Sequence, residues 1–140
     1  MFKAELSREI AVPAETAWSL LVDWGNTVWL PGLEKTEVVM RGQEVTRRLF
    51  VTGAEPIEET MLENDPTGMT LKYTIAVSEL FPLADYSGRI AVVPAENGCR
   101  VIWGSCFSQG EMSDEDAGAA ANGNLNLLLD SLQGYLEQSP

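Results

Sequence analysis

Polar and apolar residues alternate at the start of the chain, where Phe2, Ala4 and Leu6 share one parity. Such alternation is typical of a strand with one buried face. We therefore predict a β-strand over residues 2–11. The same period continues from residue 34 to residue 107, interrupted by turns, and it predicts about six further antiparallel strands.

Apolar residues recur at helical spacing in the remaining segments. Pro13 suits the first turn of a helix, and a helix of about ten residues is predicted after it. Residues 26–30 predict a second short helix, which Pro31-Gly32 would end. Ser113 is a candidate cap for a long C-terminal helix. Its apolar stripe consists of Leu125, Leu128, Leu129, Leu132, Tyr135 and Leu136.

The dipeptide Asn97-Gly98 is the strongest turn signal, because it favours the backbone angles of a type I′ hairpin. Centred there, the turn would place Val92 opposite Trp103 and Ile90 opposite Ser105. One mostly buried face would then carry Tyr86, Gly88, Ile90, Val92, Val101, Trp103, Ser105 and Phe107.

This order of elements predicts an α+β protein. A curved antiparallel sheet of about seven strands would wrap around the long C-terminal helix, with two short helices after the first strand. The 140 residues suit a single domain, residues 1–140. Because the first half of the long helix is rich in Ala and Gly, we expect a void beneath it.

The composition of the chain disfavours several classes of partner and cofactor. The net charge of −12 disfavours nucleic acid and anionic membrane surfaces as partners. Histidine is absent, and Cys99 and Cys106 would lie on opposite faces of one strand. We therefore expect no metal, no cofactor and no disulfide. Reduced thiols and the lack of a signal-type apolar core predict a cytoplasmic protein, and no apolar run is long enough to span a membrane.

Five segments in order resemble the START-like superfamily, also called helix-grip or SRPBCC proteins, and within it the bacterial polyketide cyclase/dehydrase and lipid-transport group. They are "VPAETAWSLLVDW", "WLPGLEKTEV", "RRLFVTGAEPIEETMLEND", "LKYTIAVSELFPLADYSGRIAVVP" and "NGCRVIWGSCF". The resemblance covers nearly the whole chain. It implies the helix-grip fold and an internal hydrophobic cavity, but no single reaction, because this fold hosts both binders and enzymes.

The chain is also similar to the plant abscisic-acid receptors, in which two loops act as gate and latch over the ligand. "TGAEP" and "ELFPL" resemble these loops. The resemblance therefore implies roles for Gly53, Pro56, Phe81 and Pro82 at the cavity mouth. The alternative is that both segments are plain hairpin turns.

A polar pair is the main candidate for chemistry. If the loop after Val51 is short, Arg48 lies opposite Glu59, and Glu59 matches a polar position that START-like binders point into the cavity. The pair would orient a ligand carboxylate, carbonyl or hydroxyl. A loop longer by one residue would turn Arg47 inward instead. The alternative is an exposed cross-strand pair of little energetic weight.

Other predicted ligand contacts are apolar or aromatic. Tyr73 and Tyr86 would lie on the concave faces of neighbouring strands, either toward a ligand or as ordinary core residues. Trp18 and Trp29 would seal the open end of the sheet, with Trp29 the better candidate for direct contact. The remaining candidates are Phe50, Ile57, Met61, Ile75, Phe81, Trp103, Phe107 and Leu125.

Three hypotheses follow. The first is a binder of a small hydrophobic or amphipathic molecule such as a lipid or polyketide. The second is a polyketide cyclase-type enzyme with Glu59 as base and Arg48 as enolate stabiliser. The third is a partner-binding domain with a closed cavity, and a homodimer is left open.

Overall fold

The structure is a computed structural model that describes residues 1–138. Over these residues the chain forms seven strands and two helices. In chain order they are β1 (Phe2–Ile10), α1 (Ala14–Val22), β2 (Lys35–Arg41), β3 (Glu44–Phe50), β4 (Ile57–Asp65), β5 (Thr70–Ile75), β6 (Ala84–Ala95), β7 (Gly98–Ser108) and α2 (Asp114–Leu136).

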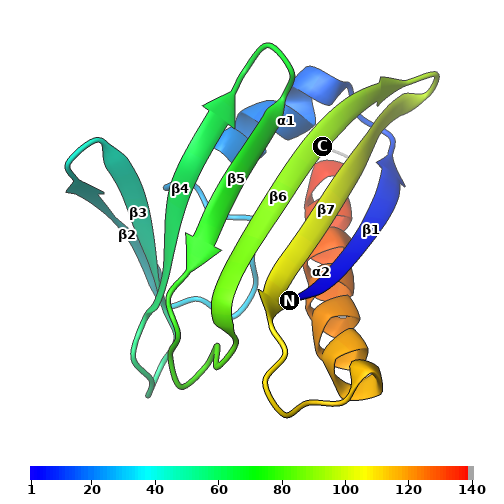
Figure 1. The fold of residues 1–140 in the computed structure, drawn as a ribbon. Helices are drawn as coiled ribbons and strands as arrows, with labels where there is room; N and C mark the ends of the chain where they lie inside the picture. Colours follow the sequence, from blue (N-terminus) through cyan, green and yellow to red (C-terminus); the bar gives the residue numbers. More distant parts are fainter. Residues whose placement is uncertain (139–140) are drawn as a thin grey trace.

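The seven strands form one antiparallel sheet in the order β1-β7-β6-β5-β4-β3-β2. The sheet curves, and both helices lie on its inner face, where α2 packs against β1 and β7 (Figure 1). The β2–β3 hairpin lies at the opposite side of the sheet from α2. This arrangement confirms the predicted α+β helix-grip fold.

Helix α2 begins where its cap was predicted. The Ser113 side chain accepts a hydrogen bond of 3.0 Å from the backbone N–H of Asp116. The fully buried stripe follows at spacings of three and four residues: Ala117, Ala121, Leu125, Leu129 and Leu132. This stripe anchors the helix on the sheet. Within residues 1–138, neither helix combines the length and apolar character needed to cross a membrane.

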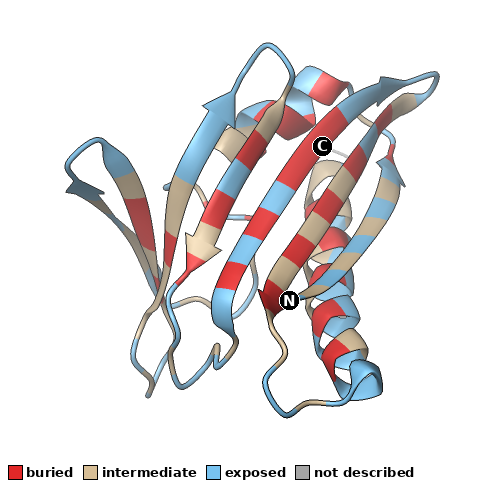
Figure 2. Ribbon diagram, viewed as in Figure 1, coloured by how far each residue is buried: buried red, intermediate tan, exposed pale blue. Residues whose placement is uncertain are grey.

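Strands β6 and β7 show the predicted alternation of buried and exposed residues, visible as bands in Figure 2. The predicted register, however, is wrong by two residues: Val92 pairs with Val101, and Ile90 with Trp103. The tip of the hairpin is Glu96-Asn97, because Ala95 pairs with Gly98. A side chain at position 98 would collide with the carbonyl of Ile10. The glycine therefore permits the close approach of β1 to the hairpin. Because side chains alternate along a strand, a register error of two residues leaves every residue of β6 and β7 on its predicted face.

The second short helix is not present. Residues 24–34 form short turns, in which the Asn26 N–H donates to the Asp23 carbonyl and the Leu30 N–H to the Thr27 carbonyl, each at 2.9 Å. Proline at position 31 disfavours the helical conformation of Leu30, the residue before it. Trp24 and Trp29 are both buried in this segment, so tertiary packing and not helical hydrogen bonding determines its path.

The two cysteines are free and lie on opposite faces of β7, as predicted. Cys99 is buried, and burial raises the pKa of its thiol. Cys106 is half-buried on the outer face.

Gly88 is required by the packing of a tyrosine. A Cβ at this position would overlap the ring of Tyr73 on the neighbouring strand, whereas a Cβ at Gly104 would meet nothing closer than 3.7 Å. We predict that Gly88→Ala lowers the free energy of unfolding by about 1–3 kcal/mol, the range for overpacked cores. Urea denaturation measures it. Gly104→Ala is the matched control and should be neutral or slightly stabilising; equal losses in both variants would contradict the packing described here.

Candidate functional site

The register between β3 and β4 decides which arginine faces the interior. Arg47 pairs with Glu59, and Arg48 with Glu58. The prediction that Arg48 lies opposite Glu59 is therefore wrong, and the alternative with the longer loop is right. The loop contains a turn in which the Val51 carbonyl accepts a 3.2 Å bond from Ala54, with Gly53 at a φ of 81°. This turn withdraws Val51 and Pro56 from the strand ladder.

Arg47 and Glu59 form a buried ion pair. Only 4% of the Arg47 side chain and 11% of the Glu59 side chain are exposed. The Nε and Nη2 atoms of Arg47 both lie 2.6 Å from a single carboxylate oxygen, Oε1 of Glu59. A buried charge is tolerated only when it is paired in this way.

Trp24 completes the cluster. The centre of the Arg47 guanidinium lies 3.6 Å from the centroid of the Trp24 ring, a cation–π contact. Arg47 Nη1 donates to the Trp24 carbonyl at 3.4 Å, and the indole N–H of Trp24 donates to the Glu59 carbonyl at 3.0 Å. Sequence reasoning missed Trp24, which lies between the two helices that were predicted after the first strand.

Arg48 and Phe50 lie on the outer face of the sheet, contrary to prediction. Arg48 pairs with Glu37 and Glu58, and its side chain is one-third exposed. The Phe50 ring lies beneath Lys35 and Arg48, at 4.6 and 5.3 Å from the cationic groups to its centroid. The one-residue register shift reverses the face of both residues.

A pocket of about 200 Å³ opens beside the ion pair. Its walls come from the turns before β2, from β3, β4, β5 and β7, from the loop after β5 and from the middle of α2. The predicted residues among them are Ile57, Glu59, Tyr73, Ile75, Phe81 and Trp103. Arg47, the alternative inward residue, also lines the pocket, and the residues that sequence reasoning missed are Leu30, Pro31, Leu33, Leu49, Val51, Asn124 and Leu128. The pocket reaches the middle of α2 rather than the Ala- and Gly-rich first half.

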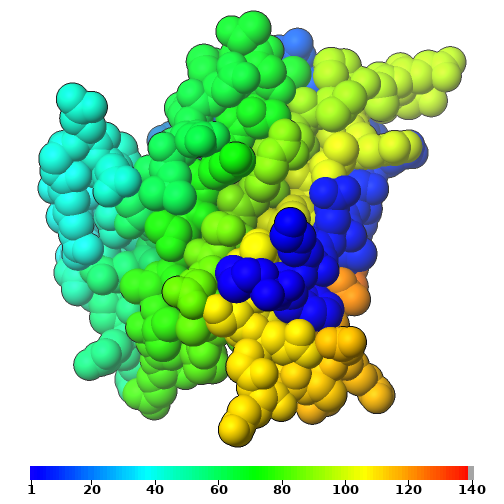
Figure 3. All heavy atoms as spheres, viewed as in Figure 1, coloured from blue at the N-terminus to red at the C-terminus, as the bar shows by residue number. Residues whose placement is uncertain are grey.

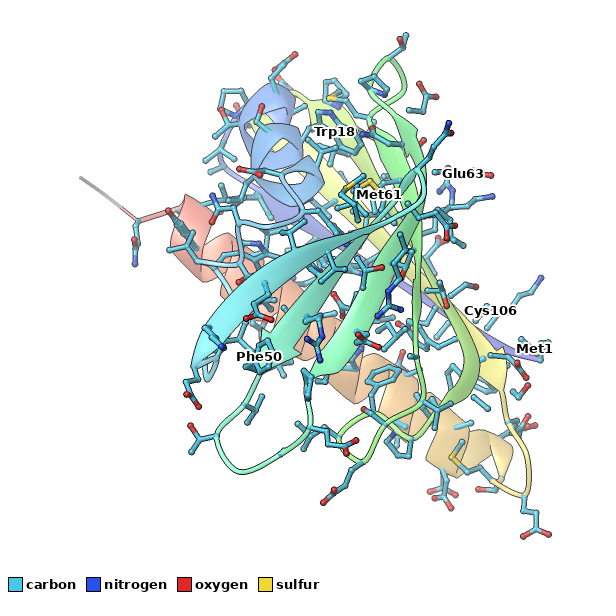
Figure 4. The ribbon with its side chains drawn as sticks, turned by 90° about the vertical axis from the view of Figure 1, so that its left-hand side faces the viewer. Met1, Trp18, Phe50, Met61, Glu63 and Cys106 are labelled. Atoms are coloured by element: carbon cyan, nitrogen blue, oxygen red, sulfur yellow. The ribbon has the colours of Figure 1, made fainter. Side chains whose placement is uncertain are left out.

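Five other predicted residues are inner-face residues outside this lining. Tyr86 of β6, Phe107 of β7 and Leu125 of α2 are buried in the hydrophobic core. Trp29 packs behind Trp103 with ring centroids 6.0 Å apart, and its indole N–H has no acceptor among the described residues. Met61 lies toward Trp18 of α1, whereas Phe50 lies near the other end of the sheet (Figure 4).

Hydroxyl groups extend the polar cluster inward. The indole N–H of Trp103 donates to the Tyr73 hydroxyl at 2.9 Å, and the hydroxyls of Tyr86 and Ser105 are 2.7 Å apart. Burial, followed by the nearby Tyr86, raises the pKa of Tyr73 well above its ordinary value. Burial also raises the pKa of Tyr86, opposed by its hydrogen bond with Ser105. Both hydroxyls are therefore neutral at physiological pH.

The loops that resemble gate and latch adjoin or contain residues of the pocket lining, Val51 and Ile57 for the first and Phe81 for the second. Phe81 lines the pocket and packs edge-on against Tyr86, with ring centroids 4.9 Å apart. Ser78 holds this loop through backbone hydrogen bonds with Phe81 in both directions. Pro56 lies outside the lining, beside a separate hollow near Arg48. The gate and latch roles of these loops remain predictions.

A wider hollow of about 530 Å³ lies on the outer face of the sheet, the face seen in Figure 3. Lys3, Lys72 and Arg89 are among its lining residues. All three side chains are exposed. Because no charged group is buried there, the hollow lacks the fixed polar groups that orient a ligand. The inner pocket is therefore the candidate site.

Comparison with known families gives a match over residues 1–137 to the model described as polyketide cyclase / dehydrase and lipid transport. The chain belongs to this family. The motifs that resemble START-like proteins had indicated the same group. Comparison with curated proteins gives no match.

Several solved structures of other proteins share the fold of this chain. An uncharacterised protein of Bacillus thuringiensis is 24% identical with a TM-score of 0.84, over 98% of this chain and 100% of its own. Protein XoxI of Bacillus cereus is 26% identical with a TM-score of 0.82, over 99% and 100%. Norcoclaurine synthase of Thalictrum flavum, solved with dopamine and hydroxybenzaldehyde, is 19% identical with a TM-score of 0.72, over 99% and 89%. At such identities the likeness carries the fold and not the activity.

The two neighbouring arginines provide a matched test of the ion pair. Arg47→Met leaves the Glu59 carboxylate buried without its partner, and we predict a loss of about 3–5 kcal/mol in the free energy of unfolding. Arg48→Met removes surface pairs worth less than about 1 kcal/mol. Chemical denaturation measures both. The reverse order of stability would show that Arg48 is the interior residue.

The buried tyrosines predict a loss of stability at alkaline pH. The pKa of Tyr73 is raised in the folded protein above the ordinary value of 10.0, so the unfolded chain releases its proton first. The stabilisation is complete below pH 10 and is lost as the pH rises toward the folded pKa. Melting temperatures measured from pH 8 upward should fall above pH 10, and Tyr73→Phe should reduce this slope. A variant with the wild-type slope would exclude Tyr73 as its source.

Proposed function

We propose that the protein binds a small hydrophobic molecule in the pocket between the curved sheet and α2. The observation that best supports this proposal is the pocket lining, in which aliphatic and aromatic side chains surround one buried ion pair, Arg47 and Glu59. Binding sites for small molecules typically combine an apolar wall with a few fixed polar groups. The lipid-transport description of the family supports the same role.

The pocket volume indicates the size of the ligand. Apolar cavities of about 150 Å³ hold a benzene molecule, and this pocket measures about 200 Å³. It accommodates a single ring with a short substituent. A longer chain would have to displace Phe81 or Leu33 at the rim, or extend out of the pocket.

The enzyme hypothesis required Arg48 and Glu59 to act together on a substrate. The side chains of these two residues are on opposite faces of the sheet, so that pairing does not support catalysis. Arg47, which takes the inner position, already contacts Glu59 and Trp24. We therefore favour binding over turnover.

Adjacent leucines on α2 offer a direct test. Leu128 lines the pocket, whereas Leu127 is 59% exposed on the outer side of the helix. Leu128→Trp should fill the pocket and weaken binding of 4-ethylphenol, a single-ring probe, at least about tenfold by isothermal titration calorimetry. Leu127→Trp should bind as the wild type does.

Native mass spectrometry of protein purified from its own source provides the complementary measurement. A small molecule should accompany the wild type and Leu127→Trp but not Leu128→Trp. Equal retention by all three proteins would place the ligand elsewhere and contradict the proposal.

A further inference from the structure

The charge arrangement beside the pocket restricts which molecules fit, if the pocket binds ligands as proposed above. We propose that it selects neutral, single-ring hydroxyl compounds, such as phenols, and discriminates against carboxylic acids. The selecting atom is Oε2 of Glu59, which would accept a hydrogen bond from the ligand hydroxyl.

Glu59 has one oxygen in use and one available. Both Nε and Nη2 of Arg47 converge on Oε1, and among the described residues no donor contacts Oε2. The Glu59 side chain is mostly buried but keeps 11% of its surface exposed. Since Glu59 lines the pocket, a ligand can reach this acceptor.

Arg47 is held by contacts to three of its five N–H groups and to the face of its guanidinium. The Glu59 carboxylate holds two of its nitrogens, the Trp24 carbonyl accepts from the third, and the Trp24 ring packs against the guanidinium. A ligand carboxylate that took both N–H groups now directed at Glu59, as a two-bond pair requires, would have to draw Arg47 away from it. That movement would leave one carboxylate buried and unpaired, which is strongly unfavourable.

The net charge of the lining favours an uncharged ligand. Arg47 and Glu59 are the cation and the anion among the lining residues, and they neutralise each other. A ligand anion would meet Oε2 at close range, and a ligand cation would meet the guanidinium. A neutral hydroxyl satisfies the free acceptor and adds no charge.

The remaining walls favour an aromatic ring. Tyr73, Phe81 and Trp103 all line the pocket, and aromatic side chains prefer tilted or stacked contacts with other rings. With a volume of about 200 Å³, one ring and a short alkyl group suffice to fill the space.

Three para-substituted ethylbenzenes test the selection: 4-ethylphenol, its methyl ether 4-ethylanisole, and 4-ethylbenzoate, each titrated calorimetrically into the wild-type protein at pH 7. The phenol should bind at least about tenfold more tightly than the ether, because the ether leaves Oε2 without a donor. The benzoate should bind more weakly than both. Equal affinity of phenol and ether, or tighter binding of the benzoate, would overturn the selection.

Glu59→Gln tests the atom itself. The Gln carbonyl would face Arg47 and its NH₂ group would face the pocket, so the acceptor becomes a donor. The preference for phenol over ether should fall to within about threefold, and benzoate affinity should rise because Arg47 is no longer neutralised. Glu58→Gln, on the outer face, should retain the wild-type order.

The two proposals fail in different ways. If phenol and ether bind equally and Leu128→Trp weakens both, the pocket binds ligands and only the selection by Glu59 is wrong. If no probe binds the wild type, both the selection and the proposed binding of single-ring molecules are wrong.

Discussion

The buried contact between Arg47 and Glu59 connects three parts of the chain that are distant in sequence. The two residues belong to neighbouring strands, and Trp24 comes from the turns that follow α1. Each member contacts the other two through a charge, a ring face or a backbone group. An unpaired charge buried inside the protein is costly. The cluster therefore fixes residues 24–34 against the sheet, and this segment forms one wall of the pocket.

The aromatic interior depends on this wall. Trp24 packs against Tyr73 with ring centroids 5.5 Å apart, and Tyr73 accepts from Trp103. Tyr73 occupies the space that a side chain at position 88 would need. The sheet therefore packs large rings together over a glycine. Two of these rings, Tyr73 and Trp103, also line the pocket.

The charge balance of the cluster also bears on function. An acidic protein whose buried arginine is already paired with a carboxylate has little means of attracting an anionic ligand. The other polar groups inside the protein near Arg47 are the Glu59 carboxylate and the neutral hydroxyls of Tyr73 and Tyr86. The family description names both cyclisation and lipid transport, and this charge balance supports the ligand-binding role proposed above.

The sequence by itself determined the strands, the faces of the strand residues on β6 and β7 but not on β3, the cap of α2, the leucines of its stripe, and the family. These depend on local periodicity and capping, which the chain carries in its own spacing. Even the two-residue error in the β6–β7 register left Trp103 and Tyr86 on the correct face.

Only the tertiary structure decided the site. A one-residue difference in the loop after β3 exchanged Arg47 for Arg48, because strand side chains alternate and a shift of one reverses the face. The role of Trp24 and the loss of the second short helix followed from packing against residues far along the chain. Such contacts leave no periodic pattern in the sequence, since they arise only when the sheet has closed around its core.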